Sequence, residues 1–159
     1  MRDLYNEQGG RKASKAGNEP ASASRKGRLY APAKRFGGSL LYISGCGPSL
    51  DGTPVTGKLG EGVTVEQGYD HARDCMLNVL AVLKREIGDL DLVKSTVKVT
   101  TFVASTPDFT QQPQVANGGT QLLMDLFGEE AGAPSRSAVG MSVLPGNMPV
   151  ETEAIFELQ

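Results

Sequence analysis

The sequence predicts an α+β fold, a β-β-α-β-α-β-β sandwich in which one mixed sheet carries two helices on a single face. Three observations support this fold class. Strand-like segments alternate apolar and polar residues, one long segment has an apolar stripe at helical spacing, and Gly or Pro separates most of these segments. A chain of 159 residues has room for one such domain and little more.

The first two strands are expected at residues 28–36 and 39–44. Gly37 and Gly38 lie between them, and two adjacent glycines readily supply the positive φ angles of a tight hairpin turn. Residues 45–63 are rich in Gly and Pro and are expected to form a loop.

The first helix is the best-defined element of the sequence. Thr64 and Gln67 have the T-x-x-Q spacing of a capping box, and Gly88 follows the last residue of the apolar pattern. The stripe consists of Val65, Tyr69, Ala72, Met76, Val79, Leu80 and Leu83. A second helix is expected at residues 114–127, weakened by Gly118 and Gly119.

Between the helices, residues 92–105 alternate as a strand. One face is expected to carry Val93, Val97, Val99 and Val103. The other face is expected to carry Lys94, Thr96, Lys98 and Thr100.

The chain is expected to finish with a hairpin of residues 136–144 and 150–158 around a turn at Pro145. In that register the face that belongs on the helices carries Ser137, Val139, Met141 and Val143 with Val150, Thr152, Ala154 and Phe156. The uncovered face carries Arg136, Ala138, Gly140 and Ser142 with Glu151, Glu153, Ile155 and Glu157. Such a face is either a solvated sheet or a subunit interface, and the small residues Ala138 and Gly140 favour the interface.

The same register separates two charged residues. Arg136 would lie opposite Glu157 and about six residues, or roughly 20 Å, from Glu151 along the sheet. A site that uses both Arg136 and Glu151 is therefore expected at a boundary between subunits.

Composition excludes several classes of protein. Lys and Arg number 16 against 18 Asp and Glu, so the overall charge does not point to nucleic acid or an anionic membrane. No apolar run approaches the roughly 18 residues that cross a bilayer, and we expect a soluble, cytoplasmic protein. With His71 as the only histidine, and Cys46 and Cys75 far apart, a three-histidine zinc site and a CxxC pair are impossible.

Residues 1–27 are expected to form a separate N-terminal extension, followed by one domain at residues 28–159. The extension has six Lys and Arg against three Asp and Glu and shows no apolar period. Such a segment is expected to be disordered or packed on a partner subunit. A basic arm for nucleic acid is the alternative, which is disfavoured because no run of Arg and Lys interleaved with aromatic residues occurs here.

Several stretches of residues 28–158 together resemble one known family. They are Tyr30-Ala31-Pro32, Leu41-Tyr42-Ile43-Ser44-Gly45, Glu66-Gln67, Leu77-Asn78-Val79-Leu80, residues 93–103, Asp108-Phe109, Pro134-Ser135-Arg136-Ser137-Ala138-Val139, Leu144-Pro145 and Val150-Glu151-Thr152-Glu153-Ala154. Their order and spacing resemble the RidA (YjgF-like, reactive intermediate deaminase) family. The N-terminal extension and the stretch at residues 88–94 resemble its longer branch.

The resemblance implies a chorismate-mutase-like fold and a homotrimer whose sheets form a central barrel, with ligand sites in clefts between subunits. It also implies an enzyme, an imine or enamine deaminase that hydrolyses 2-imino acids to 2-oxo acids and ammonia without a cofactor. The expected partners are small carboxylate-bearing imines and other copies of the chain, with no membrane and no nucleic acid.

The resemblance also implies site residues. Arg136 matches the arginine that holds the substrate carboxylate, against an ion pair with Glu157 as the alternative. Glu151 matches the glutamate that orients the attacking water. Ser44 and Gly45 would line the cleft or simply end a strand. Tyr30 would form a wall or be an ordinary strand residue, and Asn117 would help hold the water or cap a helix.

Two positions depart from the family pattern. Ala138 stands where deaminating members often have cysteine, which puts the choice of substrate in doubt. Cys46 stands where glutamine is common, and it either restores a thiol to the cleft or is a small buried hydrophobe.

Two other functions are considered as alternatives to the deaminase. A non-catalytic trimer would bind a small carboxylate metabolite as a sensor, using Arg136 but not Glu151. An endoribonuclease ranks last, because residues 28–159 have a net acidic charge and RNA binding normally needs concentrated Lys and Arg.

Overall fold

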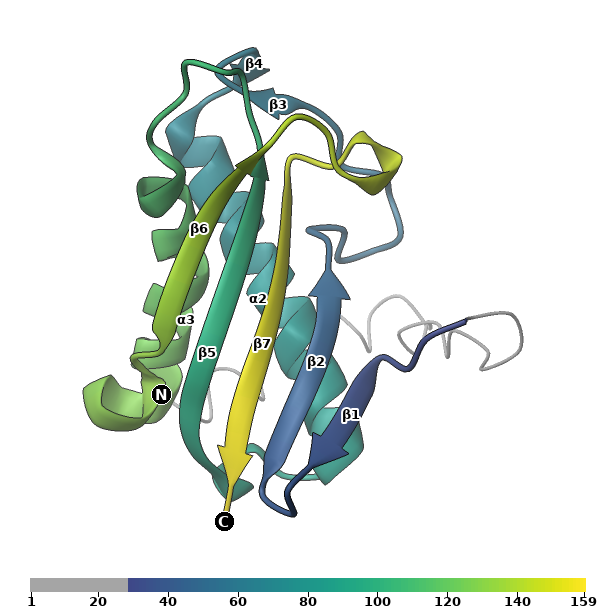
Figure 1. Ribbon diagram of the computed structural model, residues 1–159, viewed down its shortest axis with the longest axis vertical. Coiled ribbons are helices and arrows are strands. Elements are labelled where there is room, and N and C mark those ends of the chain that lie inside the picture. The colour runs from purple at the N-terminus through teal and green to yellow at the C-terminus, as the bar shows by residue number, and fades with distance from the viewer. Residues whose placement is uncertain (1–28) are drawn as a thin grey trace.

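A computed structural model describes residues 29–159, and the predicted extension at residues 1–27 lies outside this part of the chain. The described chain forms one five-stranded sheet with two helices on a single face (Figure 1). The sheet order is β1 (Ala33–Phe36), β2 (Leu40–Cys46), β7 (Val150–Leu158), β5 (Val93–Ala104) and β6 (Ser135–Met141). The helices are α2 (Val65–Ile87) and α3 (Gln112–Gly132). The predicted α+β class is confirmed.

The predicted first hairpin is confirmed. β1 and β2 pair antiparallel, from Ala33 opposite Ile43 to Phe36 opposite Leu40. Gly37 and Gly38 turn the chain with φ angles of 60° and 86°, which residues with a Cβ rarely adopt. β1 begins at Ala33, later than expected.

The capping box predicted for α2 is also present. The Thr64 hydroxyl accepts a hydrogen bond from the Gln67 amide at 3.2 Å, and the Gln67 side chain accepts one from the Thr64 amide at 2.9 Å. Gly88 ends the helix at φ 85° and donates its amide to the Lys84 carbonyl at 2.7 Å. The C-terminal part of the stripe, from Met76 to Leu83, packs in the main core against the sheet, where Leu80 and Phe156 are fully buried, and Ala72 belongs to a second buried cluster.

α3 continues through Gly118 and Gly119, and these two glycines are the residues that let it approach α2. A Cβ on Gly118 would overlap the carbonyl oxygen of Tyr69, and one on Gly119 would lie 3.1 Å from the carbonyl oxygen of Ala72. α3 therefore runs past both glycines, until Gly128 breaks its regular geometry at φ 82° and ψ 168°.

The predicted final hairpin is wrong. β6 pairs parallel with β5, with Arg136 opposite Val99, and β5 separates β6 from β7. β7 pairs with β5 from Val150 to Leu158, so the longer strand satisfies its backbone groups along nearly its whole length. The connection between β6 and β7 contains a 3-10 turn, Pro145–Asn147, and passes over the end of β5 (Figure 1).

The new pairing reverses the predicted faces of β6. Arg136 points toward α3, whereas Ser137 lies on the uncovered face, where it accepts a hydrogen bond from Lys98 at 2.7 Å. Val139 and Met141 share that face and are 38% and 36% exposed, so their predicted contact with the helices is wrong. The faces predicted for β7 are correct, since its alternate residues from Val150 to Phe156 are buried.

The alternation predicted for β5 is wrong around Val97, where the strand has a bulge. Thr96 is buried and Val97 is exposed, the reverse of the expectation. Thr96 pairs with Phe156 and Lys98 pairs with Ile155, so Val97 is an extra residue with no partner across the strands. The unpaired Val97 places Thr96 on the helix side of the sheet, and a second register shift between Val93 and Ser95 returns Val93 to the buried face where it was predicted.

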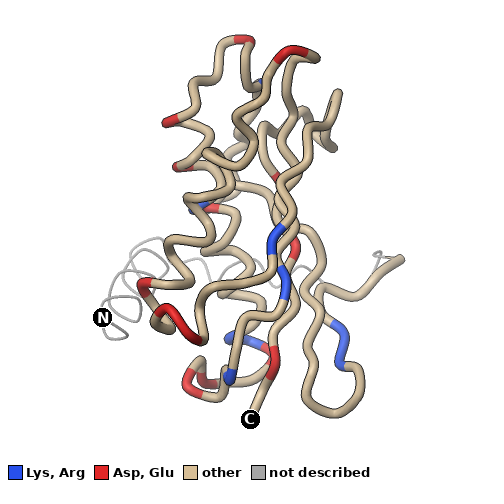
Figure 2. The backbone as a smooth tube through the Cα atoms, turned by 60° about the vertical axis from the view of Figure 1, so that its left-hand side comes forward, with Lys and Arg blue, Asp and Glu red and all other residues tan. Residues whose placement is uncertain are grey.

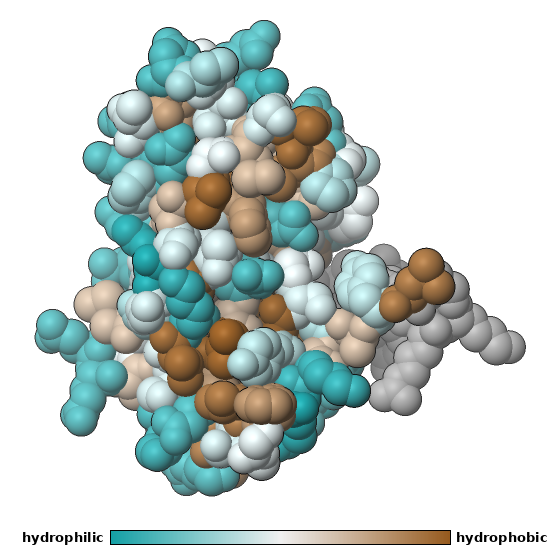
Figure 3. Space-filling view, in the orientation of Figure 1, coloured by the Kyte–Doolittle hydropathy of each residue, from teal (hydrophilic) through white to brown (hydrophobic). Residues whose placement is uncertain are grey.

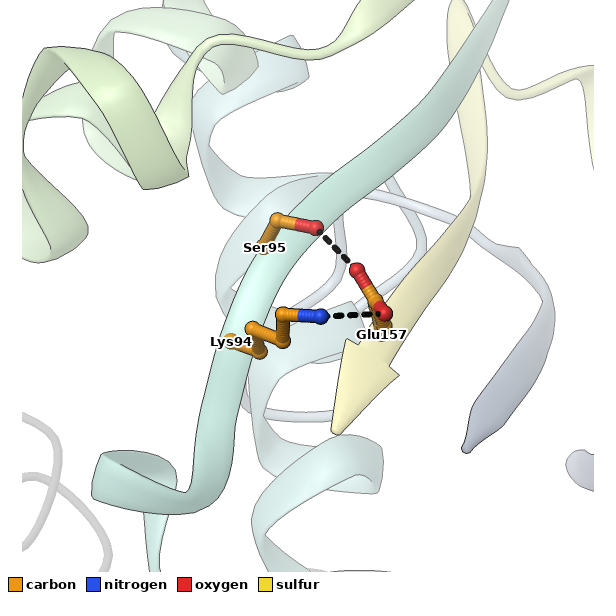
Figure 4. A network of polar contacts seen from close by, with 3 residues as sticks. All are labelled: Lys94, Ser95 and Glu157. Carbon is orange, nitrogen blue, oxygen red and sulfur yellow. Dashed lines mark hydrogen bonds and ion pairs between the residues drawn. The ribbon is translucent and has the colours of Figure 1, made fainter. Parts of the chain in front are cut away.

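Glu157 has a different partner from the one predicted. Lys94 donates to its carboxylate at 2.8 Å and Ser95 at 3.2 Å, both from β5 (Figure 4). Arg136 is not its partner, because β5 stands between their two strands. This exposed ion pair contributes little stability.

The predicted loop at residues 45–63 contains a small element that the sequence did not indicate. β3 (Lys58–Leu59) and β4 (Gly62–Val63) pair with each other. Leu59 is fully buried, and its carbonyl accepts a hydrogen bond from the Thr106 amide at 3.0 Å. This contact fixes the loop at the end of β5.

We call the sheet face that neither helix covers the open face. Apolar side chains from three of its strands are exposed there, and Figure 3 shows brown side chains gathered on this side of the molecule. They include Tyr42, Val97, Val139 and Met141. Exposed apolar side chains grouped on one sheet face are typical of a contact surface.

Candidate functional site

The predicted site residues form two groups on opposite faces of the sheet. The glutamate group comprises Glu151 on β7 with Ser44 and Gly45 at the end of β2, and Tyr30 lies before β1, next to the residues that Ser44 contacts. The arginine group comprises Arg136 on β6 and Asn117 on α3, joined by Thr120, which the sequence did not identify.

Glu151 lies directly over the backbone of Gly45. A Cβ on Gly45 would overlap the Glu151 carboxylate, so a larger residue here would displace the Glu151 side chain from its present position. The contact brings an acidic group to an exposed strand end, where Gly45 is open to solvent. The structure therefore joins two of the predicted residues through strands that are far apart in sequence.

Ser44 connects this place to the segment before β1. Its hydroxyl donates to the Ala31 carbonyl at 2.7 Å, and its amide donates to the Pro32 carbonyl at 2.9 Å. Tyr30 directly precedes this contact and is 62% exposed. The Ser44 hydroxyl proton is thus committed to the backbone, which leaves its oxygen as an acceptor.

The environment of Glu151 favours its protonated form. Burial raises the pKa of its carboxyl group above the ordinary value, and the negative charge of Glu153 raises it further. A raised pKa brings a carboxylate closer to the range in which it can exchange protons with water near neutrality.

Cys46 points away from the glutamate group. It pairs with Thr152, whose side chain is buried beneath the helices, and it packs against the main core. Its thiol donates to the Ser44 carbonyl at 3.4 Å. Cys46 is half-buried and lies on the core side of the sheet, as a small apolar residue does.

Arg136 is held by α3. Its Nη1 donates to Asn117 Oδ1 at 2.8 Å and to Thr120 Oγ1 at 3.0 Å. Partial burial lowers the pKa of the guanidinium, which nevertheless remains a cation at physiological pH. Asn117 therefore contacts the arginine, and no contact of its side chain with the glutamate group occurs among the described residues.

Thr120 was missed because a threonine inside a helix gives no sequence signal of its own. Asn117 and Thr120 are three residues apart and share one helical face, which α3 turns toward β6. Only the parallel pairing of β6 with β5 shows that Arg136 meets this face.

The two groups cannot hold one small ligand within a single chain. Arg136 pairs with Val99 and Glu151 pairs with Phe102, on opposite edges of β5. Their side chains also point to opposite sides of the sheet, Arg136 toward α3 and Glu151 toward the open face. The predicted spacing of six residues along the sheet is wrong, because Arg136 and Glu151 lie opposite β5 residues only three apart, and it is the opposite facing of their side chains that separates them.

The part of the chain that the structure describes holds no group of three or more His, Cys, Asp and Glu side chains that could bind a metal ion. In residues 29–159 no helix is both long and apolar enough to span a membrane.

Comparison with known proteins gives consistent matches over most of the chain. A family model described as "YjgF/chorismate_mutase-like, putative endoribonuclease" matches residues 12–155. A Trypanosoma cruzi protein named TCP17 is 45% identical over 122 residues, which make up 76% of each chain.

Two solved structures are similar in both fold and sequence. The Agrobacterium tumefaciens protein Atu1372, of unknown function, is 40% identical with a TM-score of 0.79, over 82% of this chain and 83% of that one. A Shewanella oneidensis structure that also bears the endoribonuclease label is 30% identical with a TM-score of 0.80, over 94% and 99% of the two chains.

Proposed function

The chain belongs to the YjgF/chorismate mutase-like family, to which RidA proteins belong, and we propose that it hydrolyses 2-imino acids to 2-oxo acids and ammonia without a cofactor. The site proposed for this reaction is a cleft between two copies of the chain. Arg136 comes from one copy and Glu151 from the next.

The placement of the two groups on opposite faces is the observation that carries this proposal. An arginine suited to a carboxylate lies at one edge of the sheet, and a glutamate with a raised pKa lies on the open face. When identical chains pack by unlike surfaces around a rotation axis, each contact joins one kind of group to the other. A closed ring thus makes as many complete sites as it has subunits.

The open face supports self-association as a homotrimer with a central barrel. Its exposed apolar side chains, Val97, Val139 and Met141 among them, would be removed from water in such an assembly (Figure 3). The driving force for association is then hydrophobic, while the polar groups at the edges determine the geometry of the clefts.

The reaction needs only the residues named above and water. The substrate carboxylate accepts two parallel hydrogen bonds from Arg136. Glu151 accepts a proton from a water molecule, whose oxygen attacks the imine carbon to give a tetrahedral carbinolamine. Glu151 gives this proton to the imine nitrogen, then takes the proton of the new hydroxyl and passes it to the amine, so that the C–N bond breaks, ammonia leaves and the carbonyl of the 2-oxo acid forms.

Ammonia release from freshly generated 2-iminopropanoate tests this function. Glu151→Gln keeps the size of the side chain but cannot accept the proton, so we expect activity to fall by at least about a hundredfold. Binding of 2-oxobutanoate by the same variant should persist, because Arg136 is intact. Undiminished ammonia release by Glu151→Gln contradicts the mechanism.

A non-catalytic binder of small carboxylates is the second candidate, and the arginine group alone favours it. It predicts that the wild-type chain binds 2-oxobutanoate through Arg136 but releases no ammonia above the uncatalysed rate. The assay above therefore separates the two candidates.

An endoribonuclease is supported least. Figure 2 shows the Lys and Arg residues of the described chain as short separate segments, without the continuous basic stripe that typically follows an RNA backbone. RNA cleavage that is lost in Arg136→Ala would reverse this order.

A further inference from the structure

We propose that Asn117 and Thr120 position Arg136 so that it presents its Nε–Nη2 edge, and not its Nη1–Nη2 end, to the carboxylate of the substrate. The proposal rests on the function proposed above and adds to it a binding mode and a positioning residue, Thr120.

Only some of the N–H groups of the Arg136 guanidinium are free to bind a ligand. The guanidinium has five N–H groups, two on each terminal nitrogen and one on Nε. Asn117 and Thr120 both accept from the same nitrogen, Nη1, at 2.8 and 3.0 Å. Both hydrogens of Nη1 are therefore in use, and no other residue in the described chain accepts a hydrogen bond from this side chain.

The Thr120 hydroxyl points in a defined direction. Thr120 is 8% exposed, and its hydroxyl lies 3.4 Å from the carbonyl oxygens of Ala116 and Asn117, one turn earlier in α3. Its proton is shared between these two carbonyls, so the remaining lone pairs face Arg136. Thr120 consequently acts toward the arginine as a fixed acceptor.

The helix that carries both acceptors is rigid. Gly118 and Gly119 lie between Asn117 and Thr120 in sequence and allow α3 to pack closely against α2. A side chain at Gly118 would not fit there. Asn117 and Thr120 are thereby held on the side of α3 that faces β6. The guanidinium plane is then fixed before a ligand arrives.

The consequence is a defined edge for ligand binding. Nε–H and one hydrogen of Nη2 are parallel and match the two oxygens of a carboxylate. Binding at the opposite end would require an Nη1 hydrogen that Asn117 and Thr120 already hold. The site should therefore discriminate in favour of planar anions with two oxygens over the corresponding amides.

The side chain of Arg136 can be observed directly by NMR of the full-length ¹⁵N-labelled protein. The Nε–H signal is assigned by its disappearance in Arg136→Lys, and 2-oxobutanoate is the probe. We expect this signal to shift downfield on titration of the wild-type protein. If 2-oxobutanoate binds through Arg136 and the Nε–H signal does not move, the proposed edge is wrong.

Kinetics test the positioning role. Thr120→Val has nearly the same shape and cannot accept a hydrogen bond, whereas Thr120→Ser keeps the hydroxyl. We expect Thr120→Val to raise KM for 2-iminopropanoate roughly tenfold with kcat little changed, which corresponds to the loss of one charge-assisted hydrogen bond. Thr120→Ser should restore the wild-type KM. Circular dichroism verifies that both variants are folded. Asn117→Ala removes the other acceptor of Nη1 and serves as a second test.

The possible failures are distinguishable. If Arg136→Lys abolishes binding of 2-oxobutanoate and Thr120→Val and Asn117→Ala both bind it as the wild type does, this inference is wrong and the proposed function stands. If the wild-type protein neither binds 2-oxobutanoate nor releases ammonia, the proposed function itself is wrong, and the inference falls with it.

Discussion

Glu151 has a raised pKa because burial and the charge of Glu153 both disfavour its ionised form. In the proposed reaction the ionised carboxylate accepts a proton from water. As the pH is lowered through the raised pKa, the ionised fraction falls, and kcat/KM for ammonia release should fall with it. The acid limb of the pH profile should therefore lie above the position expected for an ordinary glutamate.

Glu153→Gln provides the matched variant for this pH profile. It removes the neighbouring negative charge and leaves the contact between Glu151 and Gly45 intact. The pKa of Glu151 should then decrease, and the acid limb should move to lower pH. Identical acid limbs in the two proteins would show that Glu151 is not the group that titrates.

The sequence indicated Glu151 as a candidate site residue, but it did not indicate which residues would contact it in the folded chain. Glu151, Glu153 and Glu157 alternate along one strand, and the alternation does not distinguish them. In the structure Glu157 is paired with Lys94, whereas Glu151 lies over Gly45 from a distant part of the chain. Such differences come from contacts between strands, which a local pattern does not contain.

At the scale of elements, the contact between α2 and α3 depends on Gly118. In Gly118→Ala the new methyl group would overlap the Tyr69 carbonyl, so the helices must separate. We expect a loss of about 3 kcal/mol in the free energy of unfolding, measured by urea denaturation. Displacement of α3 should also move Asn117 and Thr120 and raise KM.

Gly119→Ala is the control for that variant. Its Cβ would lie 3.1 Å from the Ala72 carbonyl, a tight contact that a small shift can relieve. We expect a clearly smaller loss of stability than for Gly118→Ala. Equal losses in both variants would indicate a general intolerance of α3 to larger residues, without a special role for the Gly118 contact.

Elements with local signals were predicted well, and those that depend on distant partners were not. The capping box, Gly88 and the first hairpin lie within a few residues of the structures that they determine. The bulge at Val97 and the parallel pairing of β6 depend on which strands become neighbours. The error in the last hairpin arose because adjacent strands in sequence were assumed to be adjacent in the sheet.

At the scale of the whole molecule, a site shared between copies predicts complementation between two inactive variants. Arg136→Ala lacks the proposed ligand of the carboxylate, and Glu151→Gln lacks the proposed proton acceptor. If the two chains mix at random in the proposed trimer, roughly one site in four combines an intact Arg136 with an intact Glu151 from the neighbouring copy. Coexpression should therefore restore about a quarter of the wild-type ammonia release.

The separately expressed variants, mixed without subunit exchange, provide the control and should stay inactive. A mixed assembly that shows no recovered activity would contradict a site built from two chains. Size-exclusion chromatography with light scattering establishes that the assemblies have the expected mass.

The position of β7 has a consequence for biosynthesis. β7 follows all the other strands in the chain but lies inside the sheet, between β2 and β5. While the ribosome still holds these residues, β1 and β2 have no partner that joins them to β5 and β6. The sheet therefore closes only after release of the last strand, and truncation before Val150 should yield an aggregation-prone product with two unpaired strand edges, in place of a slightly smaller domain.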